Sequence, residues 1–487
     1  MTDTNAEAAR VPGALKTHPL LMGGQWVLGE GETITVLDKY RLVPFASVKA
    51  ASAAQVAQMI EHAHAAFRRG APSAYDRGVI LARAAGLLEA RLAEFVATMQ
   101  AEAGFTTSDA TGEVRRCIET LRLSGEEARR LSGDMIPVDG APQQAGRLAF
   151  TLRVPLGVVV AITPFNSPLN TVAHKIAPAF AAGNAVILKP STNTPITACK
   201  LAEVLLDAGM PAGFLSVVHG SGNVAHHLLA DERVRFFAFT GSTEVGRNIQ
   251  RAAGLRRTQM ELGSIAFTIL CDDADLDRAL PKIINAAYRK AGQVCTSVQI
   301  LLVHRDIMEA VEARLTEMVS ALRHGDPYAA ETVVGPLISE REAIRIEGWI
   351  GEAVGKGARR LAGGARQAAV VPPTLLANVD INMQVACREI FGPVMCLTPF
   401  ATLDEAIGRV NATPFGLATG IFTNRLLDAL AAARALEVGG VHINETSSSR
   451  VDMMPYGGSK DSGFGREGPR YAIHEMTEER IVTIATQ

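Results

Sequence analysis

The stretch GVVVAITPFNSPLNTVAHKIAPAFAAGNAVILKP, residues 157–190, holds two short apolar runs, VVVAITP and AVILKP, on either side of a helix-like segment. Continuous apolar runs of this length are typical of strands that are buried on both faces of a sheet. The same rhythm continues through LSVVHG at 215–220 and RFFAFTG at 235–241. Strands that alternate with helices predict a parallel sheet and an α/β fold. Because ligands bind beyond the carboxyl ends of such strands, residues 157–260 are expected to form a nucleotide-binding unit.

The segments on both sides of this unit have different patterns. Between residues 53 and 130, apolar residues recur at steps of three and four, which predicts a layer of helices. The alternating segment RLAFTLRV, residues 147–154, predicts a strand or hairpin that leaves the helices, and an exposed ribbon of this kind invites subunit pairing. A second α/β run is expected downstream, with strands near 266–271, 298–303 and 394–400 and helices near 274–290 and 306–323.

Length and composition exclude several classes of protein. A chain of 487 residues is too long for one hydrophobic core, so two or three domains are expected. Its net charge of −2 gives no reason to expect a nucleic-acid partner. No apolar run has the length of a signal peptide or a membrane span, so we expect a cytoplasmic protein without a membrane partner. The six cysteines form no CxxC pair, and neither they nor the 11 histidines have zinc-ligand spacing, so no metal site is expected.

Four stretches carry polar groups among apolar residues: TPFNSPLN with Asn166, LKPST with Lys189, MELGS with Glu261 and GQVCTS with Cys295. A carboxylate in such surroundings has a raised pKa and can serve as a base, and an asparagine on a stiff loop can donate to an oxyanion. Ordinary alternatives remain for each: an ion-paired acid, a turn-forming asparagine and a small buried cysteine. FTGSTEVG, residues 239–246, predicts a helix that begins at Thr243, either with amides free for a pyrophosphate or with an ordinary cap.

PFNSP, KPS, FTGSTEVG, ELGS, GQVCTS, EIFGPV and PYGGSKDSGFGREG occur in the order found in the aldehyde dehydrogenase superfamily. The chain resembles this family over nearly its whole length. The resemblance implies a Rossmann-like cofactor domain, an α/β catalytic domain and a β arm that joins subunits into dimers or tetramers. The cofactor domain would comprise residues 1–131 and 152–260, and the catalytic domain residues 261–459. Residues 132–151 and 460–487 would form the arm and a C-terminal segment.

The resemblance also implies roles for individual residues. Cys295 matches the nucleophile, Asn166 the oxyanion donor, Glu261 the general base and Lys175 a lysine near the site. The cofactor-binding positions implied are Thr163, Pro164, Phe165, Lys189, Ser191, Thr192, Gly222, Phe239, Thr240, Gly241, Ser242, Leu262, Gly263, Glu389 and Phe391. The substrate positions implied are Ser167, Arg115, Val294, Thr296, Arg450 and Tyr456. In the chemistry expected, the Cys295 thiolate attacks an aldehyde, a nicotinamide cofactor takes a hydride, and water activated by Glu261 hydrolyses the thioester.

Departures from the family pattern sharpen two of these expectations. Many relatives carry an acid where this chain has Thr192, and a carboxylate there repels a 2′-phosphate. We therefore expect NADP to be accepted as well as NAD, with the preference between them left open. Glu261 also argues against the branch that passes its thioester to coenzyme A, because that branch typically lacks an acid at this position.

The substrate is less constrained by the sequence. Ser167 replaces a common aromatic residue, which is expected to widen the pocket. Arg450 and Arg115 suggest a small polar or anionic aldehyde, and the alternative for each is a solvated or ion-paired arginine. The tail YGGSKDSGFGREG resembles the branch of lactaldehyde-like and phosphonate-derived aldehyde enzymes. Alternatives are an aromatic or larger aliphatic aldehyde, a cofactor-free thiol esterase and a catalytically silent relative.

Overall fold

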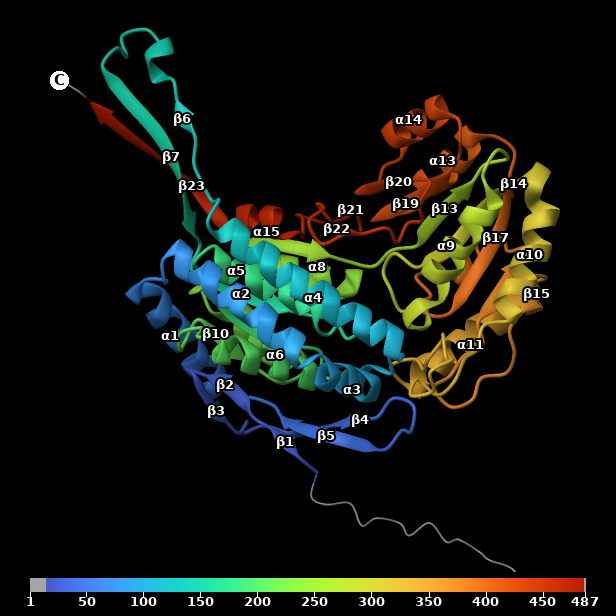
Figure 1. Ribbon diagram of the computed structural model, residues 1–487, viewed down its shortest axis with the longest axis horizontal. Helices are drawn as coiled ribbons and strands as arrows, with labels where there is room; N and C mark the ends of the chain where they lie inside the picture. The colour runs from blue at the N-terminus through green and yellow to red at the C-terminus, as the bar shows by residue number, and fades with distance from the viewer. Residues whose placement is uncertain (1–14, 486–487) are drawn as a thin grey trace, which may run out of the picture.

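The computed structural model describes residues 15–485, and its first half is built around an eight-stranded sheet (Figure 1). The strand order is β22-β12-β11-β8-β9-β10-β2-β3. The strands are β2 (Leu20–Met22), β3 (Gln25–Val27), β8 (Val158–Ile162), β9 (Ala185–Lys189), β10 (Leu215–Val217), β11 (Val234–Thr240), β12 (Arg257–Glu261) and β22 (Gly463–Phe464). The five strands from β12 to β10 are parallel, as the alternation of apolar runs and helices predicted.

Helices cover this sheet and supply most of its core. They are α1 (Ala53–Arg69), α2 (Ala74–Ala90), α3 (Leu92–Ala103), α4 (Thr107–Ala128), α5 (Asn170–Ala181), α6 (Pro195–Asp207), α7 (Gly222–Ala230), α8 (Thr243–Ala253) and α15 (Pro469–Glu475). The predicted helical layer between residues 53 and 130 is confirmed as four helices. A small sheet of β1 (Thr17–His18), β5 (Pro44–Lys49) and β4 (Thr33–Leu37) precedes them and was not predicted.

The second half is a seven-stranded sheet with a separate hydrophobic core, in the order β15-β16-β17-β14-β13-β19-β20. Its strands are β13 (Ala266–Leu270), β14 (Val298–His304), β15 (Arg359–Ala362), β16 (Thr374–Ala377), β17 (Val394–Phe400), β19 (Ala418–Phe422) and β20 (Gly440–Ile443). Its helices are α9 (Leu276–Tyr288), α10 (Met308–Ser320), α11 (Glu340–Gly355), α12 (Gln384–Cys387), α13 (Leu403–Asn411) and α14 (Leu426–Ala435), with short 3₁₀ turns η2 (Arg289–Gly292) and η3 (Arg305–Ile307). The predicted second α/β run is confirmed.

A three-stranded ribbon projects from the first half, away from both cores (Figure 1). It consists of β6 (Met135–Ile136), the turn η1 (Val138–Gly140), β7 (Arg147–Pro155) and β23 (Thr477–Ala485). β7 and β23 pair antiparallel over nine residues, so the C-terminal strand holds the ribbon in place. A two-stranded pair, β18 (Phe415–Gly416) with β21 (Ser459–Lys460), lies elsewhere in the chain. Within residues 15–485, no helix has both the length and the apolar character needed to cross a membrane.

Candidate active site

Asn166, Glu261 and Cys295 line one cavity of about 60 Å³. Glu261 ends β12, Asn166 lies in the loop after β8, and Cys295 lies in the turn before β14. The parallel strands of the first sheet end at the same edge, which brings the first two side chains toward the nucleophile turn of the second sheet. The other lining residues are Arg116, Ser167, Thr171, Thr240, Arg289, Lys290, Val294, Thr296, Ser448, Arg450, Tyr456 and Glu467.

The turn that carries Cys295 has an unusual backbone. Lys290 and Ala291 both have φ of 52°, in the left-handed region that non-glycine residues rarely adopt. Gly292 follows with φ of 68°, and a Cβ there would lie 2.1 Å from the carbonyl oxygen of Gly392. Such a backbone persists only where surrounding contacts hold it. The turn therefore places the sulfur at the cavity wall, where burial raises the pKa of the Cys295 thiol to about 11.

The side-chain amide of Asn166 is aimed at this turn. Its Nδ2 donates to the Gln293 carbonyl at 2.8 Å, two residues before Cys295. Gln293 is itself fixed, because its Oε1 accepts from the Ile338 amide at 2.9 Å and its Nε2 donates to the Lys290 carbonyl at 3.3 Å. The amide donor and the sulfur thus line the same cavity, in which an oxyanion would form after attack on a carbonyl.

Glu113, in α4, joins the loop of Asn166 to the turn of Cys295. Its carboxylate accepts from the Ser167 hydroxyl at 2.5 Å, the Asn170 amide at 2.9 Å and the Lys290 ammonium at 2.7 Å. Lys290 also donates to the Asn166 carbonyl at 3.2 Å. The Ser167 hydroxyl is held by Glu113, and the widening of the pocket expected from this small residue stays a prediction.

Glu261 is the carboxylate nearest to the expected chemistry. Its side chain is buried, and its Oε1 has no hydrogen-bond partner within residues 15–485. Burial raises its pKa well above the usual range, and the negative charge of Glu467 raises it further. In its carboxylate form this side chain, with an unoccupied oxygen and facing the same cavity as Cys295, can take a proton from water.

Glu467 was missed by the sequence analysis. It holds two cations, with Lys175 Nζ at 2.8 Å from Oε1 and Arg450 Nη2 at 3.0 Å from Oε2. Burial alone would raise its pKa, but Lys175 and Arg450 lower it to about 2. Lys175 has no exposed surface and is not among the residues that line the cavity. The only sequence signal for this acid was its place in GREG, in the tail motif.

Arg115 is exposed and is not among the residues that line the cavity, so its expected place at the substrate entrance stays a prediction. The next residue, Arg116, does line it and makes a two-point ion pair with Asp452 at 3.1 and 2.6 Å. One residue along a helix is a rotation of about 100°. Arg116 lies three residues after Glu113 and four before Thr120, both buried, so helical periodicity favoured it over Arg115.

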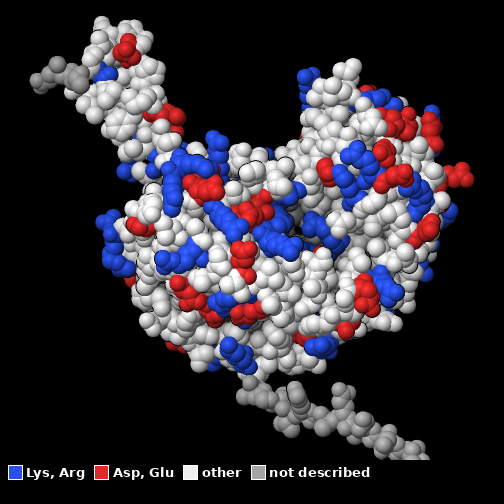
Figure 2. Space-filling view, viewed as in Figure 1, with Lys and Arg blue, Asp and Glu red and all other residues white. Residues whose placement is uncertain are grey.

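Two further guanidinium groups line the cavity. Arg289, also missed from the sequence, donates to the Ser448 hydroxyl at 2.6 Å and makes no ion pair within residues 15–485. Arg450 is ion-paired with Glu467, but its buried Nε has no partner in the described part of the chain. Figure 2 shows Lys and Arg side chains gathered around a small opening near the centre of this face, over the region of α4. The site therefore carries positive charge that its own carboxylates do not fully match.

Two of the expected substrate residues, Thr296 and Tyr456, contact other polar groups of the cavity. The Thr296 hydroxyl lies 3.1 Å from that of Ser448. The Tyr456 hydroxyl lies 3.0 Å from the Cys295 sulfur. Val294 adds an apolar side chain to the same wall.

The end of β9 offers a site for a phosphate. Lys189 is buried, makes no ion pair within residues 15–485, and has a pKa lowered by burial to about 8. Ser191 and the half-buried Thr192 follow it, and the Ser191 hydroxyl accepts from the Asn193 amide at 3.2 Å. Gly222 begins α7, where an added Cβ would meet nothing within 4 Å. A buried cation without a counterion fits an anionic ligand group.

The end of β11 adds a helix N-terminus. α8 begins at Thr243, as the sequence predicted. The Ser242 hydroxyl caps the helix by accepting from the Val245 amide at 3.4 Å, and the Gly241 amide donates to the Glu261 carbonyl at 3.0 Å. Phe239 is buried in the core beneath Gly241, so it does not offer a surface to a ligand. Thr240 instead lines the Cys295 cavity, together with the expected nucleophile.

Several of the remaining expected cofactor residues contact one another. Glu389 lies against Gly263, accepts from the Ser264 amide at 2.9 Å, and has a pKa raised by burial to about 7. Phe165 and Phe391 meet edge to face, with ring centroids 5.7 Å apart. The other expected positions nearby are Thr163, whose hydroxyl is buried without a partner in the described chain, Pro164, and Leu262.

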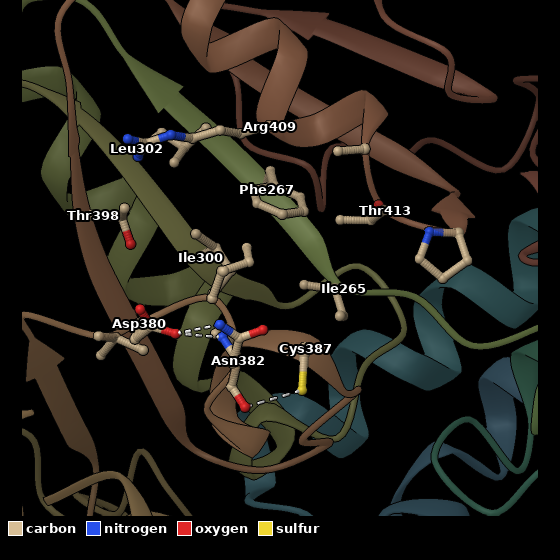
Figure 3. Close-up of a pocket in the computed structure, with 15 residues that line it drawn as sticks. Ile265, Phe267, Ile300, Leu302, Asp380, Asn382, Cys387, Thr398, Arg409 and Thr413 are labelled. Atoms are coloured by element: carbon tan, nitrogen blue, oxygen red, sulfur yellow. Dashed lines mark hydrogen bonds between the residues drawn. The ribbon is translucent and has the colours of Figure 1, made fainter. Parts of the chain in front are cut away.

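A larger hollow, of about 570 Å³, lies on the second sheet (Figure 3). Its wall is mainly apolar, with Phe267, Ile300 and Leu302 from the strands and Cys387 at one side. The Cys387 thiol donates to the Asn382 carbonyl at 3.8 Å. Within residues 15–485 this thiol has one hydrogen-bond partner, whereas Cys295 shares its cavity with Asn166 and Glu261, so the smaller cavity is the better candidate for chemistry.

Comparisons with known proteins agree with this geometry. Residues 26–482 match the model of the aldehyde dehydrogenase family. The chain is 44% identical to 3-sulfolactaldehyde dehydrogenase of Priestia aryabhattai, over 96% of this chain and 98% of that protein. Its structure is similar to aldehyde dehydrogenase 21 from Physcomitrella patens in complex with succinate (TM-score 0.95, 36% identity, covering 97% of this chain and 99% of that one). It is also similar to glyceraldehyde-3-phosphate dehydrogenase from Methanocaldococcus jannaschii complexed with NADP (TM-score 0.89, 34% identity, covering 93% and 99%). The chain belongs to the aldehyde dehydrogenase family and is an NAD(P)-dependent enzyme that oxidises an aldehyde.

Proposed function

We propose that the substrate is a small aldehyde with an anionic group at its far end, such as a carboxylate, sulfonate or phosphate. The observation that carries the proposal is Arg289, a guanidinium in the wall of the Cys295 cavity without an ion-pair partner within residues 15–485. Arg116 and Arg450 add donors to the same wall. The relatives named above act on or bind molecules with a sulfonate, a carboxylate or a phosphate, which supports an anion here. The arginines in the wall favour an anionic substrate over the aromatic or larger aliphatic alternative.

We propose that Cys295 is the nucleophile and Asn166 the oxyanion donor. The thiolate forms a carbon–sulfur bond with the aldehyde carbon, and the carbonyl electron pair moves to oxygen. The Asn166 Nδ2, which now donates to the Gln293 carbonyl, is close enough to the turn to donate to that oxygen instead. When bound, NAD(P) would accept a hydride from the sulfur-bound carbon, which then becomes the carbonyl carbon of a thioester.

Hydrolysis of the thioester is assigned to Glu261. Its carboxylate takes a proton from water, the hydroxyl oxygen bonds to the thioester carbon, and the sulfur leaves as a thiolate. Glu467 stays ionised between Lys175 and Arg450, and its negative charge keeps the proton affinity of Glu261 high. Lys175 is thus a positioning residue for Glu467.

The cofactor positions fit a dinucleotide. Lys189 and Thr192 would hold the adenosine ribose, with Lys189 available to pair with a 2′-phosphate. The cap of α8 at Ser242 would face the pyrophosphate, and Glu389 with Phe391 would hold the nicotinamide ribose. Because Thr192 carries no charge, nothing at that position repels NADP.

The assembly and location are also proposals. Six exposed apolar side chains lie on the ribbon, which supports a dimer or tetramer joined through this arm: Met135, Ile136, Leu148, Leu152, Ile481 and Ile484. The separate cores of the two sheets support a cofactor domain of residues 1–131 and 152–260 and a catalytic domain of 261–459, with 132–151 and 460–487 as arm and C-terminal segment. Residues 1–14, 486 and 487 of these ranges lie outside the described residues. Six unpaired cysteines support a cytoplasmic location.

The experiment compares succinic semialdehyde with butanal, which lacks the charge, in three variants of the full-length enzyme with NADP. Arg289→Gln and Arg116→Gln should each lower kcat/KM for the semialdehyde by about 10- to 100-fold, the worth of a charge-assisted hydrogen bond. In the same variants, kcat/KM for butanal should change by less than threefold. Arg115→Gln is the matched control, because Arg115 is next to Arg116 on the helix but is exposed and does not line the cavity. The proposal of an anionic substrate would be refuted if Arg289→Gln and Arg116→Gln lower kcat/KM for the semialdehyde no more than Arg115→Gln does.

A further inference from the structure

The Cys295 sulfur has one side-chain hydrogen-bond partner within residues 15–485, the hydroxyl of Tyr456, at 3.0 Å. While the sulfur is a thiol, either group can donate in this contact. Once the sulfur has lost its proton it can only accept, so the hydroxyl must donate. A hydrogen bond to a charged acceptor is roughly twice as strong as one between neutral groups. The contact therefore favours the thiolate over the thiol.

The hydroxyl is held in this position from two sides. The Tyr456 backbone exchanges two hydrogen bonds with Glu467, at 3.1 and 2.7 Å. The Arg450 guanidinium, which Glu467 also binds, lies 3.8 Å from the centre of the Tyr456 ring. A cation over the ring face draws electron density from the phenol and makes its O–H a better donor. The phenol itself stays protonated, because burial and then the negative charges of Cys295 and Glu261 raise its pKa well above the usual range.

The charged groups around the sulfur do not by themselves produce a thiolate. Glu261 and Glu389 raise the pKa of Cys295, and Arg450 lowers it. The positive charge of Arg289 interacts with Cys295 and favours the negative charge of the thiolate. Burial is the largest influence and opposes ionisation. A neutral donor in direct contact with the sulfur is therefore well placed to decide how much thiolate is present.

We propose that the Tyr456 hydroxyl donates a hydrogen bond to the Cys295 thiolate and is a catalytic residue of this enzyme, holding the nucleophile in its reactive form until the carbon–sulfur bond forms. The inference rests on Cys295 being the nucleophile. It separates two tasks: Tyr456 stabilises the sulfur before attack, and Glu261 is left to activate water afterwards. A phenylalanine would fill the same space without the donor.

The test is alkylation of the full-length enzyme by iodoacetamide, an uncharged probe, across a range of pH without substrate. The sulfur displaces iodide, so the rate follows the thiolate fraction. In Tyr456→Phe the apparent pKa of Cys295 should rise by about one, which slows alkylation at neutral pH about tenfold. Tyr288→Phe is the matched control, since it also removes a buried tyrosine hydroxyl, which donates to the Thr374 carbonyl at 3.0 Å.

Each outcome decides between the two proposals. If Cys295→Ala keeps the fast alkylation phase, the assigned nucleophile is wrong. If Cys295→Ala loses that phase, the nucleophile stands. In that case the role of Tyr456 is overturned if the alkylation rate of Tyr456→Phe stays within twofold of the parent rate, or equals the rate of Tyr288→Phe. Should Tyr456→Phe unfold, 3-fluorotyrosine at this position keeps the shape and strengthens the donor. It should lower the apparent pKa and raise the ultraviolet absorbance of the thiolate, and no change in either would overturn the proposal.

Discussion

The affinity for NADP should fall more steeply than the affinity for NAD between pH 7 and pH 9. Burial lowers the pKa of Lys189 to about 8 in the free enzyme. Its protonated fraction therefore drops from about nine-tenths at pH 7 to about one-tenth at pH 9, which is about tenfold. A 2′-phosphate carries its full charge over this range, because its second pKa is about 6. If the phosphate binds only the ammonium form, the Kd for NADP rises about tenfold.

The assay is titration of each cofactor against the intrinsic protein fluorescence at several pH values. The ratio of the two Kd values isolates Lys189, because Glu389 has a pKa raised to about 7 and affects the ribose shared by both cofactors. Lys189→Arg is the control, since a guanidinium stays charged over the whole range and should flatten the ratio. A ratio in the parent enzyme that changes by less than twofold from pH 7 to pH 9 would refute the assignment of Lys189 to the phosphate.

Three further results are expected. Glu261→Gln should still release about one equivalent of NADPH in a rapid burst and then turn over about 10²- to 10⁴-fold more slowly, because the base for thioester hydrolysis is lost; a normal steady state without a burst would contradict its role. Glu467→Gln leaves two buried cations without their carboxylate and should cost about 3–5 kcal/mol of stability in thermal or chemical unfolding, whereas the exposed Glu309→Gln should cost almost nothing. Replacing Leu148 and Leu152 together by lysine should give smaller particles in light scattering if the arm joins subunits, and an unchanged mass would count against that interface.

The sequence predicted the parts of the fold that repeat a local pattern. Apolar runs such as VVVAITP have to be buried on both faces, and this requirement determines both the sheet and the edge at which its strands end. The sequence did not predict β1 or β4, because strands of two and five residues owe their existence to pairing with distant partners rather than to a local period. Propensity along the chain contains little information about such pairings.

The site residues that belong to a short sequence motif were predictable. Those whose place in the site depends on charge pairing with distant residues were harder to predict. Cys295, Asn166 and Glu261 each stand in a short motif, and the structure brings them to one cavity. The partnership of Lys175 with Glu467 spans 292 residues and left no local signal. Arg289 stands only six residues before the nucleophile, but its missing counterion becomes visible only when the surrounding acids are in place.

The late position of Arg450, Tyr456 and Glu467 in the chain affects how the enzyme is made. A ribosome adds residues from the N-terminus onward, so Cys295 emerges long before the segment that supplies these three side chains. Until that segment arrives and its backbone pairs Tyr456 with Glu467, the nascent polypeptide has a thiol without its hydroxyl partner and a Glu261 without the neighbouring charge. Premature termination anywhere before this segment should therefore yield a product in which the Cys295 thiol reacts slowly.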